Sequence, residues 1–216
     1  GAAYAEIAEK YGASPGELEI KRAFSHAFTS APPLAFGEFS QEERKKLEKQ
    51  WWKNVVRDVY ERVGMFDDFD SYFEELFDHF KNRAWTAFPD SASALGEIKK
   101  MGYEIMLVSN FDSRVYGVLK ELELENYFSS FTISSEAGFS KPSPEIFRIA
   151  LEKHGAKPEE CLHIGDDMEK DYIGATNAGI KSLLLLREGE AENTPSIRSL
   201  EQIPQLLGET VKEARA

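Results

Sequence analysis

Short apolar runs alternate with amphipathic helical stretches in the part of the chain that follows Pro89. Strands are predicted at 103–108, 131–134, 161–164 and 182–186, with helices near 91–101, 115–122, 144–151 and 171–178 between them. Strands and helices of this length that alternate along a chain form a parallel sheet with helices on both faces. The sequence therefore predicts an α/β fold for residues 89–216.

Residues 1–88 have a different pattern, which is helical and rich in aromatic side chains. Ser14 with Glu17 and Ser40 with Glu43 have the spacing of capping boxes, and each pair predicts the start of a helix. Apolar stripes at helical spacing follow, and aromatic stripes of this kind usually serve packing. We expect a small helical bundle as a separate domain.

Charge and cysteine content exclude several classes of protein. The formal net charge is −12, which argues against nucleic-acid binding, because such binding relies on clustered Lys and Arg. The single cysteine, Cys161, excludes an internal disulfide and fits a reducing compartment. The apolar stretch at 183–186 is too short for the ~20 residues of a membrane span. We expect a soluble intracellular protein. The chain opens on Gly1, so a targeting segment upstream would not be visible and the organelle is not predicted.

Polar side chains follow three of the predicted strands. Ser109 and Asn110 end the first strand, Lys141 lies before a proline in the loop after the second, and Asp166 and Asp171 follow the third. Ligands of parallel sheets bind beyond the carboxyl ends of the strands, and carboxylates there suit Mg²⁺. Each feature alone also has a structural explanation: a helix cap, a solvated lysine, or acidic residues that favour a helix dipole.

Taken together and in this order, the hydroxyl, the Lys-Pro pair and Gly-Asp-x-x-x-x-Asp resemble motifs II, III and IV of the haloacid dehalogenase superfamily. The segments Val-Ser-Asn-Phe-Asp-Ser-Arg, Lys-Pro-Ser-Pro-Glu-Ile-Phe and His-Ile-Gly-Asp-Asp are similar to those of hydrolases of the rhythmically expressed gene 2 type. The resemblance implies a Rossmannoid core at 89–216 and a helical cap at 1–88 that closes over the substrate. Trp51, Trp52, Trp85 and Phe88 could line a substrate pocket, although core packing is the simpler interpretation for most of them.

The resemblance also implies roles for the polar residues. Ser109 would hydrogen-bond the phosphoryl group of a small phosphorylated metabolite, with Asn110 beside it. Lys141 would neutralise charge on the nucleophile and the phosphoryl group. Asp166 would ligate Mg²⁺ directly, and Asp171 would orient the metal's other ligands or its bound water. The family reaction is mostly hydrolysis of phosphate monoesters through an aspartyl-phosphate.

Motif I of the family, a hydrophobic strand that ends in Asp-x-Asp-x-Thr, has no counterpart in these 216 residues. Asp68-Phe69-Asp70 matches the Asp-x-Asp part of the motif, but no threonine follows and the surrounding sequence predicts a helix start. We therefore expect a core without its first strand, weak Mg²⁺ binding and no catalytic nucleophile in the chain as given. The resemblance places that strand between those ending at Ser109 and Ile164, so a strand-donating chain or self-association is expected.

Three interpretations of the missing motif follow. The chain is a fragment or isoform of an ordinary phosphatase, or a natural pseudoenzyme that keeps the fold for binding. The third is a phosphoacceptor receiver domain, which combines the same residue types. Receiver domains have the acidic pair first and Lys-Pro last, whereas Lys141 precedes Asp166 here. The order of the motifs argues against the receiver domain.

Overall fold

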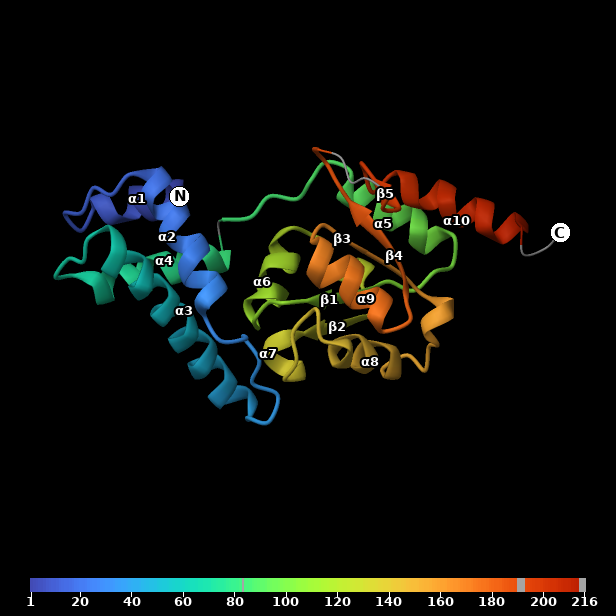
Figure 1. Ribbon diagram of the computed structural model, residues 1–216, viewed down its shortest axis with the longest axis horizontal. Helices are drawn as coiled ribbons and strands as arrows, with labels where there is room; N and C mark the ends of the chain where they lie inside the picture. Colours follow the sequence, from blue (N-terminus) through green and yellow to red (C-terminus); the bar gives the residue numbers. More distant parts are fainter. Residues whose placement is uncertain (83, 190–192, 214–216) are drawn as a thin grey trace.

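A computed structural model describes residues 1–82, 84–189 and 193–213. The chain forms two lobes, with the helices α1 to α4 in one and all strands in the other (Figure 1). Along the described chain, no helix combines the length and the apolar character needed to cross a membrane.

The helical lobe, as far as residue 82, contains four helices. They are α1 (Ala2–Glu9), α2 (Glu17–Ser30), α3 (Gln41–Val63) and α4 (Phe69–Asn82). The capping box at Ser40 is confirmed, since the Glu43 amide donates to Ser40 Oγ at 3.4 Å and the Ser40 amide donates to Glu43 Oε2 at 3.1 Å. The box predicted at Ser14 is wrong. The helix begins two residues later, with Gly16 as N-cap, because Glu19 reaches back to accept the Gly16 amide at 3.3 Å.

Aromatic side chains fill the interior of the helical lobe. Tyr60, Tyr72 and Phe73 are almost fully buried, and the Tyr60 hydroxyl donates to the Tyr72 hydroxyl at 2.7 Å. Their rings meet edge to face, the geometry that aromatic quadrupoles favour. Packing is therefore the role of most of the aromatic stripe, as the sequence indicates.

Among the described residues, the second lobe contains five short strands, all paired in parallel. They are β1 (Met106–Ser109), β2 (Ser130–Ile133), β3 (Leu162–Gly165), β4 (Lys181–Leu185) and β5 (Ser196–Ile197). The four predicted strands are confirmed to within a few residues. Strand β5 has only two residues, too few for periodicity to reveal it.

Helices connect and cover these strands. The α-helices are α5 (Ser91–Lys100), α6 (Arg114–Glu121), α7 (Ser134–Ala137), α8 (Pro144–Glu152), α9 (Gly174–Asn177) and α10 (Gln202–Glu213). Short 3₁₀ turns, η1 (Glu125–Tyr127) and η2 (Pro158–Glu160), precede β2 and β3. The helix predicted at 171–178 is instead a π-helical turn, η3 (Met168–Ile173), that leads into α9. The Asp167 carbonyl accepts from both the Asp171 and Tyr172 amides, which widens this turn.

Successive residues of β1 pack on opposite faces, as expected for a strand. Leu107 lies with Val115 and Leu119 of α6, whereas Val108 packs against Phe147 of α8 and Ala175 of α9. A third cluster joins α5 and α10 to β3, β4 and β5. The predicted α/β class, with helices on both faces, is confirmed.

The strands form two parallel sheets, with β1 in one and β3 in the other. Strand β1 pairs with β2, and β3 pairs with β4, which in turn pairs with β5. Within residues 1–82, 84–189 and 193–213, no strand occupies the second edge of β1 or of β3. All residues of β1 and β3 are only half-buried, whereas a strand in the middle of a covered sheet is normally fully buried.

Polar contacts and a close backbone approach join the two lobes. Glu48 of α3 is buried and accepts hydrogen bonds from the Ser113 amide at 3.2 Å and the Ser113 hydroxyl at 2.5 Å. A Cβ at Gly37 would lie 2.8 Å from the Gly138 amide nitrogen, so only glycine fits there. One apolar cluster draws its buried members from residues 4–76 and the others from residues 98–203. The domain boundary at residues 88 and 89 stays a prediction.

Candidate functional site

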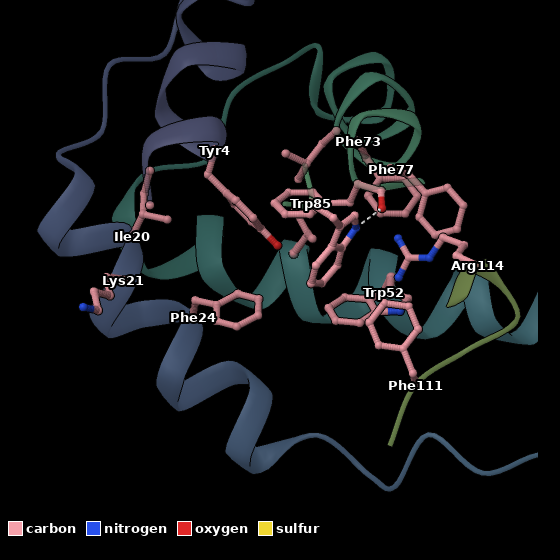
Figure 2. Close-up of a pocket in the computed structure, with 14 residues that line it drawn as sticks. Tyr4, Ile20, Lys21, Phe24, Trp52, Phe73, Phe77, Trp85, Phe111 and Arg114 are labelled. Atoms are coloured by element: carbon pink, nitrogen blue, oxygen red, sulfur yellow. Dashed lines mark hydrogen bonds between the residues drawn. The ribbon is translucent and has the colours of Figure 1, made fainter. Parts of the chain in front are cut away.

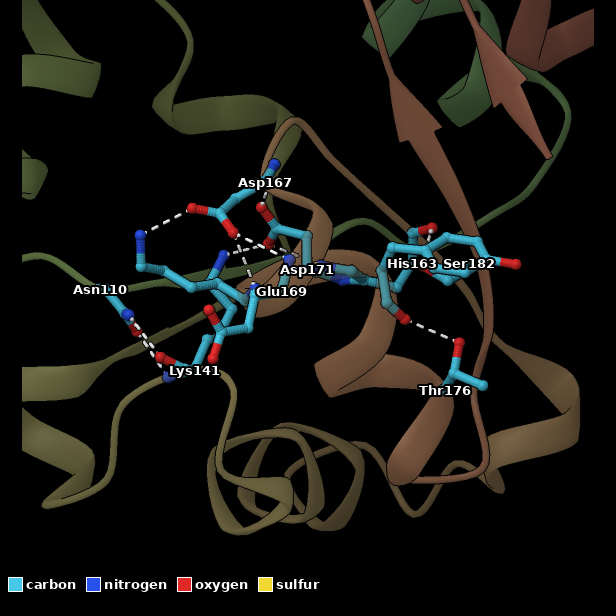
Figure 3. A network of polar contacts seen from close by, with 10 residues as sticks. Asn110, Lys141, His163, Asp167, Glu169, Asp171, Thr176 and Ser182 are labelled. Carbon is cyan, nitrogen blue, oxygen red and sulfur yellow. Dashed lines mark hydrogen bonds and ion pairs between the residues drawn. The ribbon is translucent and has the colours of Figure 1, made fainter. Parts of the chain in front are cut away.

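The loops that follow β1, β2 and β3 converge, and Asn110 links the first to the second (Figure 3). The Asn110 side-chain amide donates to the Lys141 carbonyl at 2.8 Å, and its oxygen accepts the Lys141 amide at 2.7 Å. Both polar ends of Asn110 are thus used by the Lys141 main chain. This pair of bonds brings the Lys141 loop to the end of β1.

Lys141 and His163 both contact the buried carboxylate of Asp171. Lys141 Nζ lies 2.5 Å from Asp171 Oδ1, and His163 Nε2 donates to the same oxygen at 3.0 Å. Burial alone would raise the pKa of Asp171. The hydrogen bond from His163 and the charge of Lys141 outweigh it and hold the pKa of Asp171 well below its usual range. The lysine head group is therefore fixed by an ionised partner.

Gly165 and the widened turn η3 let Asp171 reach this position. A Cβ at Gly165 would lie 2.1 Å from Asp171 Cγ, so any side chain there would displace the carboxylate. The second oxygen of Asp171 accepts the Asp167 amide at 3.1 Å. Sequence reasoning assigned no role to His163 or Asp167. The signal for His163 is its strand spacing, because residues 163 and 165 share one face of β3.

Ser109 and Asp166 stand at the ends of β1 and β3 with free polar atoms. Ser109 is half-buried, and its hydroxyl has no hydrogen-bond partner in the described part of the chain. Asp166 is exposed, and among the same residues its carboxylate makes no hydrogen bond or ion pair. By contrast, Asp167 Oδ2 pairs with Lys170 Nζ at 2.6 Å, and hydrogen bonds from Lys170 lower the pKa of Asp167 despite partial burial. Ser109 and Asp166 are therefore the groups open to a ligand.

The donors present do not form a metal site by themselves. No group of three or more His, Cys, Asp or Glu side chains that could hold a metal ion occurs among the described residues. Asp166 is open, but Asp171 is already occupied by Lys141, His163 and the Asp167 amide. Mg²⁺ prefers six oxygens in an octahedron, and these residues do not supply that set. Weak Mg²⁺ binding stays a prediction.

The site carries more acidic than basic side chains. The segment 166–171 contains Lys170 and four carboxylates, those of Asp166, Asp167, Glu169 and Asp171, and Lys141 lies close to Asp167 and Asp171 (Figure 3). An anionic ligand would therefore meet opposing charge, unless it bound close to Lys141 or brought a cation with it.

Two further aspartates, Asp112 after β1 and Asp70 in the helical lobe, are engaged in ion pairs and are not free to attack a substrate. Asp112 is fully buried, where it pairs with Arg114 at 2.7 Å and accepts from Trp52 Nε1 at 2.5 Å. Asp70 lies in the first turn of α4, in the helical lobe, and pairs with Lys53 at 3.0 Å. The prediction that Asp68-Phe69-Asp70 marks a helix start is confirmed.

Comparisons with known proteins agree with this architecture. A family model for haloacid dehalogenase-like hydrolases matches residues 2–179. The chain is 30% identical over 219 residues to haloacid dehalogenase-like hydrolase domain-containing protein 3 of Danio rerio, covering 96% of this chain and 88% of that protein. It is 35% identical over 102 residues to a glyceraldehyde 3-phosphate phosphatase of Methanothermobacter thermautotrophicus, covering 47% and 45% of the two chains. The magnesium-bound putative HAD-hydrolase YfnB of Bacillus subtilis superposes with a TM-score of 0.73 at 18% identity, covering 96% of this chain and 92% of that one.

Proposed function

Because this chain belongs to the haloacid dehalogenase-like hydrolases, we propose that its site binds the phosphoryl group of a small phosphorylated metabolite. One observation carries the proposal: Asp171, just after β3, holds the Lys141 ammonium, and Asn110 ties the Lys141 main chain to the end of β1, where Ser109 is the last residue. A positive charge and a hydroxyl donor at strand ends suit an anionic oxygen. The phosphatase similarity over about half of the chain supports the same substrate class.

Each residue has a defined part in this proposal. Ser109 donates a hydrogen bond to a phosphoryl oxygen, and Lys141 neutralises its charge. Asn110 positions the Lys141 loop, since both ends of its side chain are occupied. Asp171 and His163 hold the Lys141 head group in place. Asp166 is the predicted Mg²⁺ ligand, while the contacts of Asp171 suit a role in orienting neighbours rather than ligation.

The family reaction, Mg²⁺-dependent hydrolysis of a phosphate monoester, begins with attack by the first aspartate of Asp-x-Asp-x-Thr. The 216 residues contain no such segment at the end of a strand. This chain alone is therefore proposed to bind phosphoryl groups without turning them over. A natural pseudoenzyme with a binding or interaction role is the alternative proposal.

Binding is tested with inorganic phosphate, titrated into the chain with Mg²⁺ in excess and followed by amide chemical shifts. We expect shifts around residues 109–110 and 140–143, which Lys141→Ala abolishes. Lys120→Ala, which removes an exposed lysine of α6, is the matched control and should leave them unchanged. Phosphate binding that survives Lys141→Ala would contradict the proposal.

Turnover is tested separately with a generic aryl phosphate and Mg²⁺. No release of the phenol is expected, because the surviving groups can only stabilise charge. Clear turnover that Asp166→Ala abolishes would refute this part of the proposal. It would mean that a carboxylate of the loop after β3 had taken over the attack.

A further inference from the structure

A pocket of about 290 Å³ lies in the helical lobe where that lobe meets α6 (Figure 2). Its walls are almost entirely aromatic and aliphatic, and they include Phe24, Trp52, Phe73, Phe77, Trp85 and Phe111. An engineered cavity of about 150 Å³ already accommodates benzene, and small-molecule sites begin near 300 Å³. The space therefore suits a ligand of about two fused rings.

The aromatic walls are held by contacts that point away from the pocket or along its rim. Trp52 Nε1 donates to Asp112, and Trp85 Nε1 donates to the Phe80 carbonyl at 2.8 Å. The Arg114 guanidinium stacks on the rings of Phe77 at 4.4 Å and Trp52 at 5.0 Å while Asp112 neutralises it. The indole N–H groups are thus satisfied elsewhere, and the rings offer their faces to a ligand.

Tyr4 supplies one polar atom in this apolar surrounding. Its side chain is only 7% exposed, and its hydroxyl points into the ring-lined space (Figure 2). Across the described residues this hydroxyl has no hydrogen-bond partner, whereas those of Tyr60 and Tyr72 both bond within the lobe. Burial raises the pKa of Tyr4, so the group stays a neutral donor and acceptor. The hydroxyl is therefore open to a hydrogen bond with a polar atom of a ligand in the pocket.

The pocket borders the loop that follows β1. Phe111 forms part of its wall and follows Ser109 by two residues, which separates their Cα atoms by at most about 7 Å. A molecule seated in the pocket can therefore carry a group toward the end of β1.

From the size, the aromatic walls and the free Tyr4 hydroxyl, we infer that the pocket binds an aromatic fused-ring group bearing a hydrogen-bonding atom. This inference rests on the proposed function where it names the substrate class: phosphate monoesters of aromatic alcohols, with the rings in the pocket and the phosphoryl group at Lys141. Of the four aromatic residues considered for a substrate pocket, Trp52 and Trp85 line this one. Trp51 packs in the lobe's core, and Phe88 is exposed and lies under Arg187.

Calorimetry with 2-naphthol tests the pocket alone, without any catalytic step. We expect binding by the wild-type chain, weaker binding by roughly 2- to 12-fold in Tyr4→Phe through loss of one hydrogen bond, and no binding in Val56→Phe, which fills the space. Tyr11→Phe is the matched control, because the Tyr11 hydroxyl bonds to Glu75 outside the pocket. Absence of 2-naphthol binding by the wild-type chain, or equal affinity for octan-1-ol, would overturn the inference. Unchanged affinity in both Tyr4→Phe and Val56→Phe would do the same.

A second titration with 2-naphthyl phosphate separates this inference from the proposed function. We expect tighter binding than for 2-naphthol, with the difference lost in Lys141→Ala and the affinity for 2-naphthol unchanged there. If 2-naphthol binds and 2-naphthyl phosphate binds no more tightly, the proposed function is wrong and the inference about the pocket is supported. If inorganic phosphate binds and 2-naphthol does not, the pocket inference fails and the proposed function stands.

Discussion

At the scale of single residues, the sequence identifies the polar groups of the site but not their partners. Ser109 ends β1 and Asp166 directly follows β3, whereas Lys141 lies in the loop between α7 and α8. The contact of Asp171 with Lys141 and His163 could not be predicted, because it depends on the widened turn and on the missing Cβ of Gly165. Spacing along a chain reveals which loop a residue belongs to, whereas side-chain pairing depends on how the loops meet.

The buried Lys141–Asp171 pair makes the stability of the chain depend on pH. The pKa of Asp171 is lowered in the folded state, so its stabilising contribution is complete above the carboxyl's ordinary pKa of 3.8 and is lost as the pH falls through the folded-state pKa. Asp171→Asn should lower the free energy of unfolding by roughly 3 kcal/mol at neutral pH, because it leaves the Lys141 charge unpaired. The difference in the free energy of unfolding between the wild type and Asp171→Asn should become smaller below about pH 4, as measured by urea unfolding at a series of pH values.

Asp166→Asn is the matched control for this pH dependence, since Asp166 is exposed and unpaired within the described chain. Its unfolding curves should follow those of the wild type. If the free energy of unfolding changed with pH in the same way for the wild type and Asp171→Asn, the Lys141–Asp171 pair would contribute nothing to the acid sensitivity of the chain.

Metal binding is the second property decided by single residues. Mg²⁺ should bind weakly on its own, because Asp166 is open while Asp171 is occupied. The carboxylates of Asp166, Asp167, Glu169 and Asp171 outnumber the two lysines, Lys141 and Lys170, which disfavours binding of a phosphate dianion alone. Phosphate and Mg²⁺ should therefore each raise the affinity for the other. Calorimetric titration of Mg²⁺ with and without inorganic phosphate measures this coupling. A tight Mg²⁺ site that is indifferent to phosphate would contradict it.

At the scale of helices and strands, periodicity predicts regular elements well and irregular ones poorly. The strand of His163 and the helix of Phe147 follow the expected pattern of apolar side chains. The π-helical turn at 168–173 looks like an ordinary helix start in the sequence, and β5 is too short to carry a pattern. Both depend on contacts with distant segments, which sequence periodicity does not contain.

Asp90 is the residue that ties three elements of the α/β lobe together. It precedes α5 and accepts two hydrogen bonds from Arg187, just beyond β4, both at 2.9 Å. The Ser199 hydroxyl and the Leu200 amide, just before α10, donate to it at 2.8 and 2.9 Å. Asp90→Ala should therefore lower the free energy of unfolding by roughly 1.5 to 3 kcal/mol, measured by urea unfolding.

Asp70→Ala provides the comparison for Asp90→Ala, because it removes an aspartate whose ion pair with Lys53 is largely exposed. Exposed pairs contribute about 0 to 1 kcal/mol, so its effect should be small. Equal effects of the two substitutions would show that Asp90 does not join these elements.

At the scale of the whole molecule, the strands of the α/β lobe are divided between two sheets. The sequence pattern predicts strands of both sheets, and the alternation of strands with helices predicts that the strands are parallel. The separation between β1 and β3 was expected only through the family resemblance, which places a further strand there. In the described chain each of these strands keeps one edge without a neighbour.

We predict that a strand supplied from outside stabilises the chain. Unpaired backbone groups cost about 1 to 3 kcal/mol each when buried, and a domain's total stability is typically only about 5 to 15 kcal/mol. A single strand placed between β1 and β3 would lie about 4.8 Å from each and could pair with both. A synthetic peptide with an apolar strand ending in Asp-x-Asp-x-Thr should therefore raise the melting temperature, and a scrambled peptide of the same composition should not. Without it, self-association through the open edges is expected and can be followed by sedimentation. A monomer that melts cooperatively in the ordinary mesophilic range, unaffected by the peptide, would contradict the prediction, because its sheets would then be stable without a strand between them.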